Sequence, residues 1–249
     1  MNRQLTGVMA DLHFSPTEQS RANLLKENKP AEAIFVTGNT AIDALKTTVS
    51  EHYTHPVIEK MGTDRMILLT AHRRENLGEQ MRNMFRAIMR LLSEHEDVQV
   101  VYPVHMNPAV REVANEILGD NPRVHLIEPL EVFDFHNFAA RSYMILTDSG
   151  GVQEEAPSLG KPVLVLRDTT ERPEGIAAGT LKLAGTDEEV IYKMAKELLI
   201  NDEAYEAMAH ASNPYGDGYA SERIVEALLQ FAQKQLVKEN ETAEKVETR

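Results

Sequence analysis

The feature that most constrains the fold is a regular alternation of short apolar runs with longer amphipathic stretches. Such alternation is typical of βαβ units, in which a parallel sheet is covered by helices on both faces. We expect strands at Ile34–Val36, Met66–Thr70, Val98–Tyr102, Val124–Ile127, Met144–Thr147 and Pro162–Leu166. The sequence therefore predicts an α/β fold with a Rossmann-like, doubly wound parallel sheet.

Helical periodicity fills the intervals and the stretch after the last strand. The expected helices are Thr17–Glu27, Thr40–Ser50, Gln80–Glu94, Pro108–Leu118, Val132–Ala140, Val152–Leu159, Asp187–Ile200, Glu203–His210 and Ser221–Val237. Asn2 to Phe14 is expected to be a loop entering a short buried strand, because it lacks the opening strand and glycine turn of a doubly wound domain. We expect a remnant of one domain over 1–38, a main domain over 39–237 and a disordered charged tail over 238–249.

Composition excludes several classes of function. With 39 acidic and 26 basic side chains the net charge is −13, which disfavours nonspecific nucleic-acid binding. The chain has no cysteine, which suits a reducing compartment such as the cytoplasm. It shows no signal-peptide pattern, and no apolar run approaches the roughly 20 residues that span a bilayer. We therefore expect a soluble cytoplasmic protein that does not bind membranes.

The strongest motif is the run Thr147 to Ala156, between an apolar strand and a helix. Gly150 and Gly151 let backbone N–H groups approach a ligand closely, and the start of a helix favours a phosphate. Ser149 can donate to the same phosphate, and Glu155 can accept from both hydroxyls of a ribose. The alternative is a tight turn before a capped helix, but the added serine and glutamate favour a nucleotide diphosphate.

Two further strand ends carry cations. His72, Arg73 and Arg74 stand in a row, which is costly unless an anion binds, and arginine grips phosphate bidentately. The alternative is a solvated basic patch. In the run Arg167 to Glu174, Pro173 marks a helix start and leaves Arg172 at the mouth of the site. Salt bridges within this run are the alternative.

Two single residues give weaker signals. His105 ends a strand on the same predicted edge, although such a histidine more often packs or caps. Phe135 can stack on a base, although an aromatic in an amphipathic helix is normally a core residue. The sequence has no metal-ligand spacing and no GxGxxG, so neither a metal nor a redox cofactor is expected.

Several long motifs, taken in order, closely resemble the bacterial non-hydrolysing UDP-N-acetylglucosamine 2-epimerases. The resemblance extends from Asn2 to about Phe231. The matching runs are Asn2-Arg3, His13 to Thr17, His72 to Asn76, Tyr102 to Pro108, Asp148 to Pro157, Asp168 to Glu174 and Asn213 to Gly218. The resemblance implies a GT-B architecture of two Rossmann-like domains with UDP-GlcNAc between them.

The resemblance also implies site residues. It places UDP against His72, Ser149, Gly150, Gly151, Glu155 and Arg172, with Phe135 and the backbone of Leu130 near the uracil. It implies epimerisation at carbon 2 by elimination of UDP to a 2-acetamidoglucal and re-addition, without a metal or nicotinamide. A second, activating UDP-GlcNAc is implied at Arg73 and His105, and the full-length family implies a homodimer.

The sequence departs from the family at its beginning. The family's arginine, lysine, aspartate and glutamates of the first half precede the position that matches Met1. We therefore expect a truncated form that keeps the UDP site, with His72 as the remaining catalytic candidate and no appreciable turnover by this chain alone. A UDP-sugar-binding or regulatory module, or a UDP-sugar glycosyltransferase, are the alternatives.

Overall fold

The chain divides into two compact units. The computed structural model describes residues 2–247. One unit comprises the residues up to Ala44 together with those from Tyr215 on, and the other runs from Leu45 to Pro214. The first division falls within helix α3 (Thr40–Thr48), close to the expected boundary at Gly38. The final helix belongs to the unit that holds the N-terminal residues, and not to the main domain in which the sequence placed it.

The larger unit is built on a parallel sheet. Among the described residues, six strands pair in the order β5-β4-β3-β6-β7-β8. Their bounds are β3 Arg65–Thr70, β4 Val98–Pro103, β5 Val124–Ile127, β6 Met144–Thr147, β7 Val163–Val165 and β8 Leu181–Leu183. The predicted doubly wound α/β fold is confirmed. Of the strands in this sheet, only the short β8 was missed, because Lys182 interrupts its apolar run.

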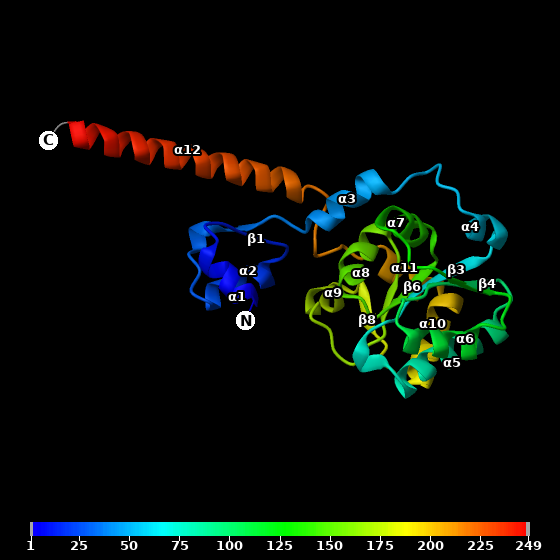
Figure 1. The fold of residues 1–249 in the computed structure, drawn as a ribbon. Helices are drawn as coiled ribbons and strands as arrows, with labels where there is room; N and C mark the ends of the chain where they lie inside the picture. Colours follow the sequence, from blue (N-terminus) through cyan, green and yellow to red (C-terminus); the bar gives the residue numbers. More distant parts are fainter. Residues whose placement is uncertain (1, 248–249) are drawn as a thin grey trace. The chain divides into compact units, whose positions relative to one another are not determined.

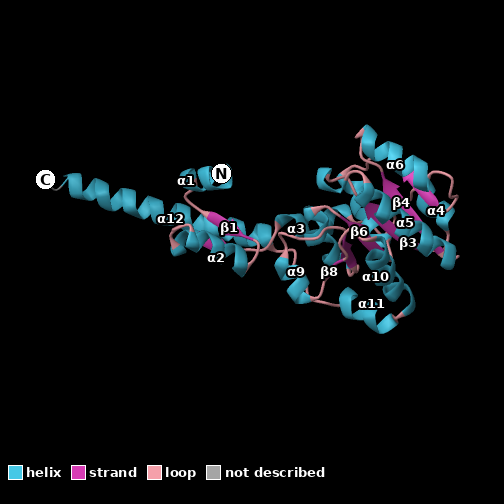
Figure 2. Ribbon diagram, turned by 90° about the horizontal axis from the view of Figure 1, so that it is seen from below, coloured by secondary structure: helices cyan, strands magenta, loops and turns pink. Residues whose placement is uncertain are grey.

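Helices cover both faces of this sheet (Figure 1, Figure 2). Their bounds are α4 Pro56–Met61, α5 Glu79–Glu94, α6 Pro108–Leu118, α7 Val132–Arg141, α8 Gly150–Glu155, α9 Pro173–Ala178, α10 Glu188–Ile200 and α11 Asp202–Ala209, with 3-10 turns η2 Arg74–Asn76 and η3 Ala156–Leu159. The expected helices are found with small shifts of their ends. The unexpected α4 begins after Pro56, where His55 Nδ1 accepts from the N–H of Val57.

Alternate residues of the central strand β3 enter two separate cores. Ile67 and Leu69 pack with α5, α6 and α10, whereas Met66 and Leu68 pack with Phe138 of α7 and its neighbours. The two-residue period of a strand sends successive side chains to opposite faces. Ile67, Leu68 and Leu69 are fully buried, and each such burial stabilises the fold by about 1.5–3 kcal/mol.

The strand order creates a topological switch point, where the connections from two adjacent strands run in opposite directions. From β3 the chain moves to β4 on one side, and from β6 it moves to β7 on the other, while β3 and β6 are paired through Thr70 and Thr147. Connections that diverge from adjacent strands leave a crevice beyond the strand carboxyl ends, where ligands bind in such folds. The residues after Thr70 and Thr147 are therefore placed at the opening of this crevice.

The smaller unit contains one parallel strand pair, β1 (His13–Ser15) with β2 (Ile34–Val36). Its other elements are α1 Asn2–Met9, α2 Glu18–Lys26, η1 Ala31–Ala33 and α12 Ala220–Glu247. The expected loop before Phe14 was wrong, because α1 occupies most of it. Contacts distant in sequence hold this helix: Lys29 donates to the carbonyl of Gly7 at 2.7 Å, and Arg3 pairs with Glu27.

The expected disordered tail is also corrected. Helix α12 continues past Val237 to Glu247, so the residues from Lys238 to Glu247 are helical. The segment is rich in Glu and Lys, which are good helix formers and can extend a helix that already exists. None of the described helices has both the length and the apolar character needed to cross a membrane.

Candidate functional site

Three adjacent strands bring the predicted motifs together. The turn with His72 follows β3, the turn with Ser149 follows β6, and the turn with Arg172 follows β7, and these strands are neighbours in the order β3-β6-β7. Motifs separated by many residues in sequence thus meet at the carboxyl ends of these strands. The switch point lies at the same end of the sheet.

A buried carboxylate joins the first two turns. Asp148 is completely buried, and its Oδ2 accepts from the backbone N–H of His72 at 2.9 Å and of Arg73 at 2.8 Å. The Asn76 amide donates to the same oxygen at 3.1 Å and to the carbonyl of Leu166 at 3.2 Å. Hydrogen bonds to a charged acceptor are strong, so Asp148 fixes the turn after β3. Sequence reasoning missed this role, although a buried acid directly after an apolar strand was a visible signal.

The other oxygen of this carboxylate faces His72. Asp148 Oδ1 is buried, has no hydrogen-bond partner among the described residues, and lies 3.5 Å from Nδ1 of His72. The His72 side chain is 41% exposed. Its imidazole can therefore contact a ligand on the open side while the carboxylate orients it from behind.

The turn after β6 leads directly into α8. Thr147 Oγ1 lies 2.5 Å from Thr70 Oγ1 and accepts from the N–H of Ser149 at 3.0 Å. Ser149 is the N-cap residue of α8, yet its side chain makes no capping hydrogen bond. A Cβ on Gly150 would lie 3.2 Å from the guanidinium carbon of Arg172. Glycine is therefore what permits this cation to approach the backbone closely.

Arg172 is held in place by carboxylates. It is the N-cap residue of α9, and Pro173 begins that helix as the sequence predicted. Its Nε donates to Glu154 at 2.7 Å, and its Nη1 lies 3.6 Å from Glu171. The guanidinium thus lies over Gly150 in a defined orientation while the side chain remains 27% exposed.

The salt bridges that the sequence left as an alternative are also present: Arg172 pairs with Glu171 at 3.6 Å, and Arg167 pairs with it more closely. Arg167 donates to both oxygens of Glu171, at 2.7 and 3.0 Å. The hydrogen bond from Arg167 is the main reason that the pKa of Glu171 falls from 4.5 to about 2. Arg167 is buried and Glu171 is ionised at neutral pH, so this pair is structural.

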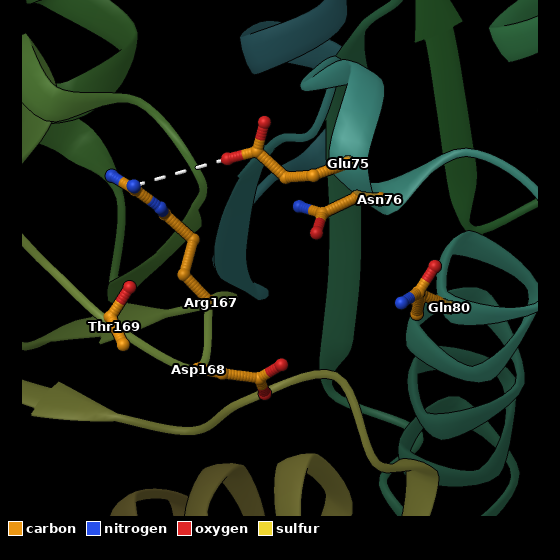
Figure 3. A pocket seen from close by; sticks show the side chains of 6 residues that line it. All are labelled: Glu75, Asn76, Gln80, Arg167, Asp168 and Thr169. Atoms are coloured by element: carbon orange, nitrogen blue, oxygen red, sulfur yellow. Dashed lines mark ion pairs between the residues drawn. The ribbon is translucent and has the colours of Figure 1, made fainter.

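A small cavity lies between the turns after β3 and β7. It has a volume of about 140 Å³ and is lined by Glu75, Asn76, Gln80, Arg167, Asp168 and Thr169 (Figure 3). Arg167 Nη2 lies 3.9 Å from Glu75 across it. Small-molecule sites usually measure roughly 300–1,000 Å³. This cavity alone is therefore too small for a nucleotide.

The residues proposed for the ribose and the uracil are all partly buried. Glu155 ends α8 with 22% of its side chain exposed, and its Oε2 lies 3.4 Å from Nε2 of His136. Leu130 and Phe135 are partly buried and pack against the core cluster that contains Phe138. Their packing matches the structural alternative weighed for Phe135.

Arg73 and His105 lie beside the His72 turn. Arg73 Nε donates to the carbonyl of Asp148 at 2.8 Å, and its Nη1 lies 3.4 Å from Glu75. His105 follows β4, and its ring stacks on that of His72 with centroids 5.2 Å apart and planes 8° apart. Residues expected at two ligand positions are thus in direct contact. Among the described residues, no group of three or more His, Asp or Glu has the arrangement of a metal site.

Known proteins resemble this chain in sequence and in fold. The family model described as UDP-N-acetylglucosamine 2-epimerase matches residues 1–229. The Bacillus subtilis UDP-N-acetylglucosamine 2-epimerase is 73% identical over 229 residues, which are 92% of this chain and 60% of that protein. The S. aureus MnaA–UDP co-structure has a TM-score of 0.90 and 57% identity, covering 93% of this chain and 64% of the other.

A third similar protein was solved with a sugar nucleotide. The UDP-GlcNAc 2-epimerase from Neisseria meningitidis, bound to UDP-GlcNAc, has a TM-score of 0.83 and 47% identity, over 92% of this chain and 64% of that one. The chain spans about 60% of the length of the curated relatives that it matches.

Proposed function

Because this chain belongs to the UDP-N-acetylglucosamine 2-epimerase family, we propose that it supplies the UDP-binding part of an enzyme that interconverts UDP-GlcNAc and UDP-ManNAc. The observation that carries this proposal is the meeting of three turns, with His72, Ser149 and Arg172, at one switch point. Each turn contributes a cation, a hydroxyl or backbone N–H groups. Together they suit a diphosphate.

We assign the parts of UDP to these turns. The backbone of Gly150 and Gly151, the Ser149 hydroxyl and the Arg172 guanidinium receive the diphosphate. Glu155 accepts from the ribose hydroxyls, since a carboxylate has acceptor sites for both. Phe135 and the backbone of Leu130 border the uracil; their partial burial is compatible with one exposed face.

The proposed chemistry explains why cations gather here. Carbon 2 loses its proton and the anomeric carbon–oxygen bond breaks, which gives a 2-acetamidoglucal and UDP. UDP then adds back while a proton arrives on the opposite face of carbon 2. Charge grows on the departing diphosphate, so Arg172 and the N–H groups stabilise the transition state. His72, exposed beside Asp148, is the group to which we assign a direct role.

A second nucleotide position adjoins the first in this proposal. Arg73 and His105 would receive an activating UDP-GlcNAc, and the stacking of His105 on His72 supports contact between the two positions. We also propose a cytoplasmic location and a homodimer, both on the resemblance to the family.

Binding without turnover is the second candidate function, because the cation and glycine backbone beside α8 suit a diphosphate whether or not carbon 2 reacts. Proton NMR of the chain with UDP-GlcNAc in deuterated water separates the two. Deuterium at carbon 2 supports epimerisation by this chain. Saturation transfer to UDP-GlcNAc without exchange, which we expect for the chain alone, supports the binding part only. Absence of both signals contradicts the proposal.

A further inference from the structure

Glu155 lies beside a buried histidine that the proposed mechanism does not use. His136 lies on α7, only 4% of the residue is exposed, and its Nε2 is 3.4 Å from Glu155 Oε2. On the other side of the ring, Nδ1 is 2.7 Å from Thr48 Oγ1 at the end of α3. The imidazole thus bridges a half-buried hydroxyl and the carboxylate that faces the proposed ribose position.

The proton positions follow from the chemistry of the partners. A carboxylate only accepts, so an attractive contact requires the proton on Nε2 of His136. In the neutral ring with that proton, Nδ1 accepts from the Thr48 hydroxyl, and in the charged ring Nδ1 donates to it. In both forms Nε2 presents a donor to Glu155, and Thr48 holds the ring at the opposite end.

Thr48 is itself fixed by the residue next to His136. The Asn137 amide donates to the carbonyl of Thr48 at 2.7 Å, and its oxygen accepts from the N–H of Ser50 at 2.9 Å. Asn137 is completely buried. Two consecutive residues of α7 therefore contact the same segment: Asn137 binds its backbone, and His136 contacts the side chain of Thr48.

The second oxygen of Glu155 faces the glycine turn. A Cβ on Gly151 would lie 3.7 Å from Glu155 Oε1, so this oxygen is next to backbone without a side chain. Because Oε2 lies 3.4 Å from His136, the two oxygens of this carboxylate have different surroundings, and we assign Oε1 to the proposed nucleotide. Preorganised acceptors lose less entropy when a ligand binds.

We propose that His136, positioned by Thr48, is a specificity-determining residue: it orients Glu155 so that the site selects a ribonucleoside diphosphate over its 2′-deoxy analogue. This inference rests on the proposed function, because it requires UDP at this site. His136 acts through Glu155 and is therefore a positioning residue.

The test compares the affinities of the full chain for UDP and 2′-deoxy-UDP by calorimetry. We expect the parent to prefer UDP on the order of tenfold, which corresponds to one hydrogen bond to a charged group. Glu155→Ala should bring the ratio of the two affinities close to one. A parent that does not bind UDP contradicts the proposed function itself, whereas a parent that binds both equally contradicts only this inference.

Two substitutions of the histidine separate its two contacts. Asn places its amide near Nδ1, on the Thr48 side, and Gln places its amide near Nε2, on the Glu155 side. We expect His136→Asn to lose most of the preference for UDP while its affinity for 2′-deoxy-UDP stays within about twofold. His136→Gln keeps a donor towards Glu155 but loses the contact with Thr48, so it should retain more of the preference than His136→Asn does. A purely structural role would lower both affinities together and in both variants, which would overturn the inference.

Thr48→Val provides a variant without a change at α7. It removes the hydroxyl but leaves the Thr48 carbonyl for Asn137, so it is suitable if His136→Asn does not fold. We expect the preference for UDP to fall by several-fold, with thermal melting close to the parent's. An unchanged preference in Thr48→Val, or in a folded His136→Asn, contradicts the inference.

Discussion

At the scale of single residues, the site depends on buried charges that bind other protein groups. Asp148 receives two backbone N–H groups and the Asn76 amide, so it shapes the turn that carries His72. Arg172 and Arg167 are each matched by a nearby glutamate. These partners orient the cations before any ligand arrives, and preorganisation of this kind is what strengthens electrostatic stabilisation.

Asp148→Asn should destabilise the protein. The amide keeps the size of the side chain but removes the charge that three donors share, and it leaves an NH2 group facing His72. We expect the free energy of unfolding to fall by about 1.5–3 kcal/mol. Urea unfolding followed by circular dichroism measures this. Asp168→Asn, at an exposed carboxylate, is the matched control and should change stability by less than about 0.5 kcal/mol; equal effects would refute the assigned role of Asp148.

Glu171 should make stability depend on acid pH. Its pKa is lowered from 4.5 to about 2 in the folded chain, chiefly by the hydrogen bond from Arg167. A depressed folded pKa gives stability that is present above the unfolded value of 4.5 and is lost as the pH falls towards 2. The melting temperatures of the parent and of Glu171→Gln should therefore differ at pH 6. The difference should shrink as the pH falls from 4.5 towards 2. A difference that is constant over this range would contradict the pair's role.

At the scale of elements, the sequence allowed the larger unit to be predicted closely. Strands β3, β6 and β7 are nearly continuous runs of Val, Ile, Leu and Met because both of their faces are buried. Elements that depend on distant contacts were missed. Helix α1 needs Lys29 and Glu27, and β8 pairs with β7 although it has only three residues.

The candidate site was predictable to the level of its turns. The runs with His72, Ser149 and Arg172 were found because cations and glycines after apolar strands form a local pattern. The roles of Asp148 and His136 were missed, because each depends on groups more than 70 residues away in the sequence. Side-chain partners of this kind are set by tertiary packing.

One element depends on an arginine from outside it. Arg123 precedes β5, and its guanidinium donates to the carbonyls of Leu92 and His95 at the end of α5 and to that of Val98. Cations stabilise the carboxyl end of a helix, where carbonyls lack partners. We expect Arg123→Gln to lower the free energy of unfolding by about 2 kcal/mol.

A surface arginine provides the comparison. Arg82 pairs bidentately with Glu116 on exposed parts of α5 and α6. Exposed pairs contribute about 0–1 kcal/mol, so Arg82→Gln should have a much smaller effect. Thermal melting of both variants checks this. Equal losses would mean that the carbonyl contacts of Arg123 add nothing beyond an exposed charge.

At the scale of the whole molecule, one sheet of the larger unit organises every proposed contact with UDP. The strand order puts β3, β6 and β7 side by side, so that residues from His72 to Arg172 share one edge. The central claim is that the three turns form a single UDP site.

Calorimetric titration of the full chain with UDP tests this claim most directly. The parent should bind UDP with one site per chain, and Arg172→Ala and Glu155→Ala should each weaken binding by about 1.5–3 kcal/mol, or roughly ten- to 150-fold. Arg82→Ala, whose guanidinium pairs with Glu116 on an exposed helix face and not with a residue of the three turns, should bind like the parent. If the parent does not bind UDP, or if Arg172→Ala and Glu155→Ala both bind it as the parent does, the three turns do not form a UDP site.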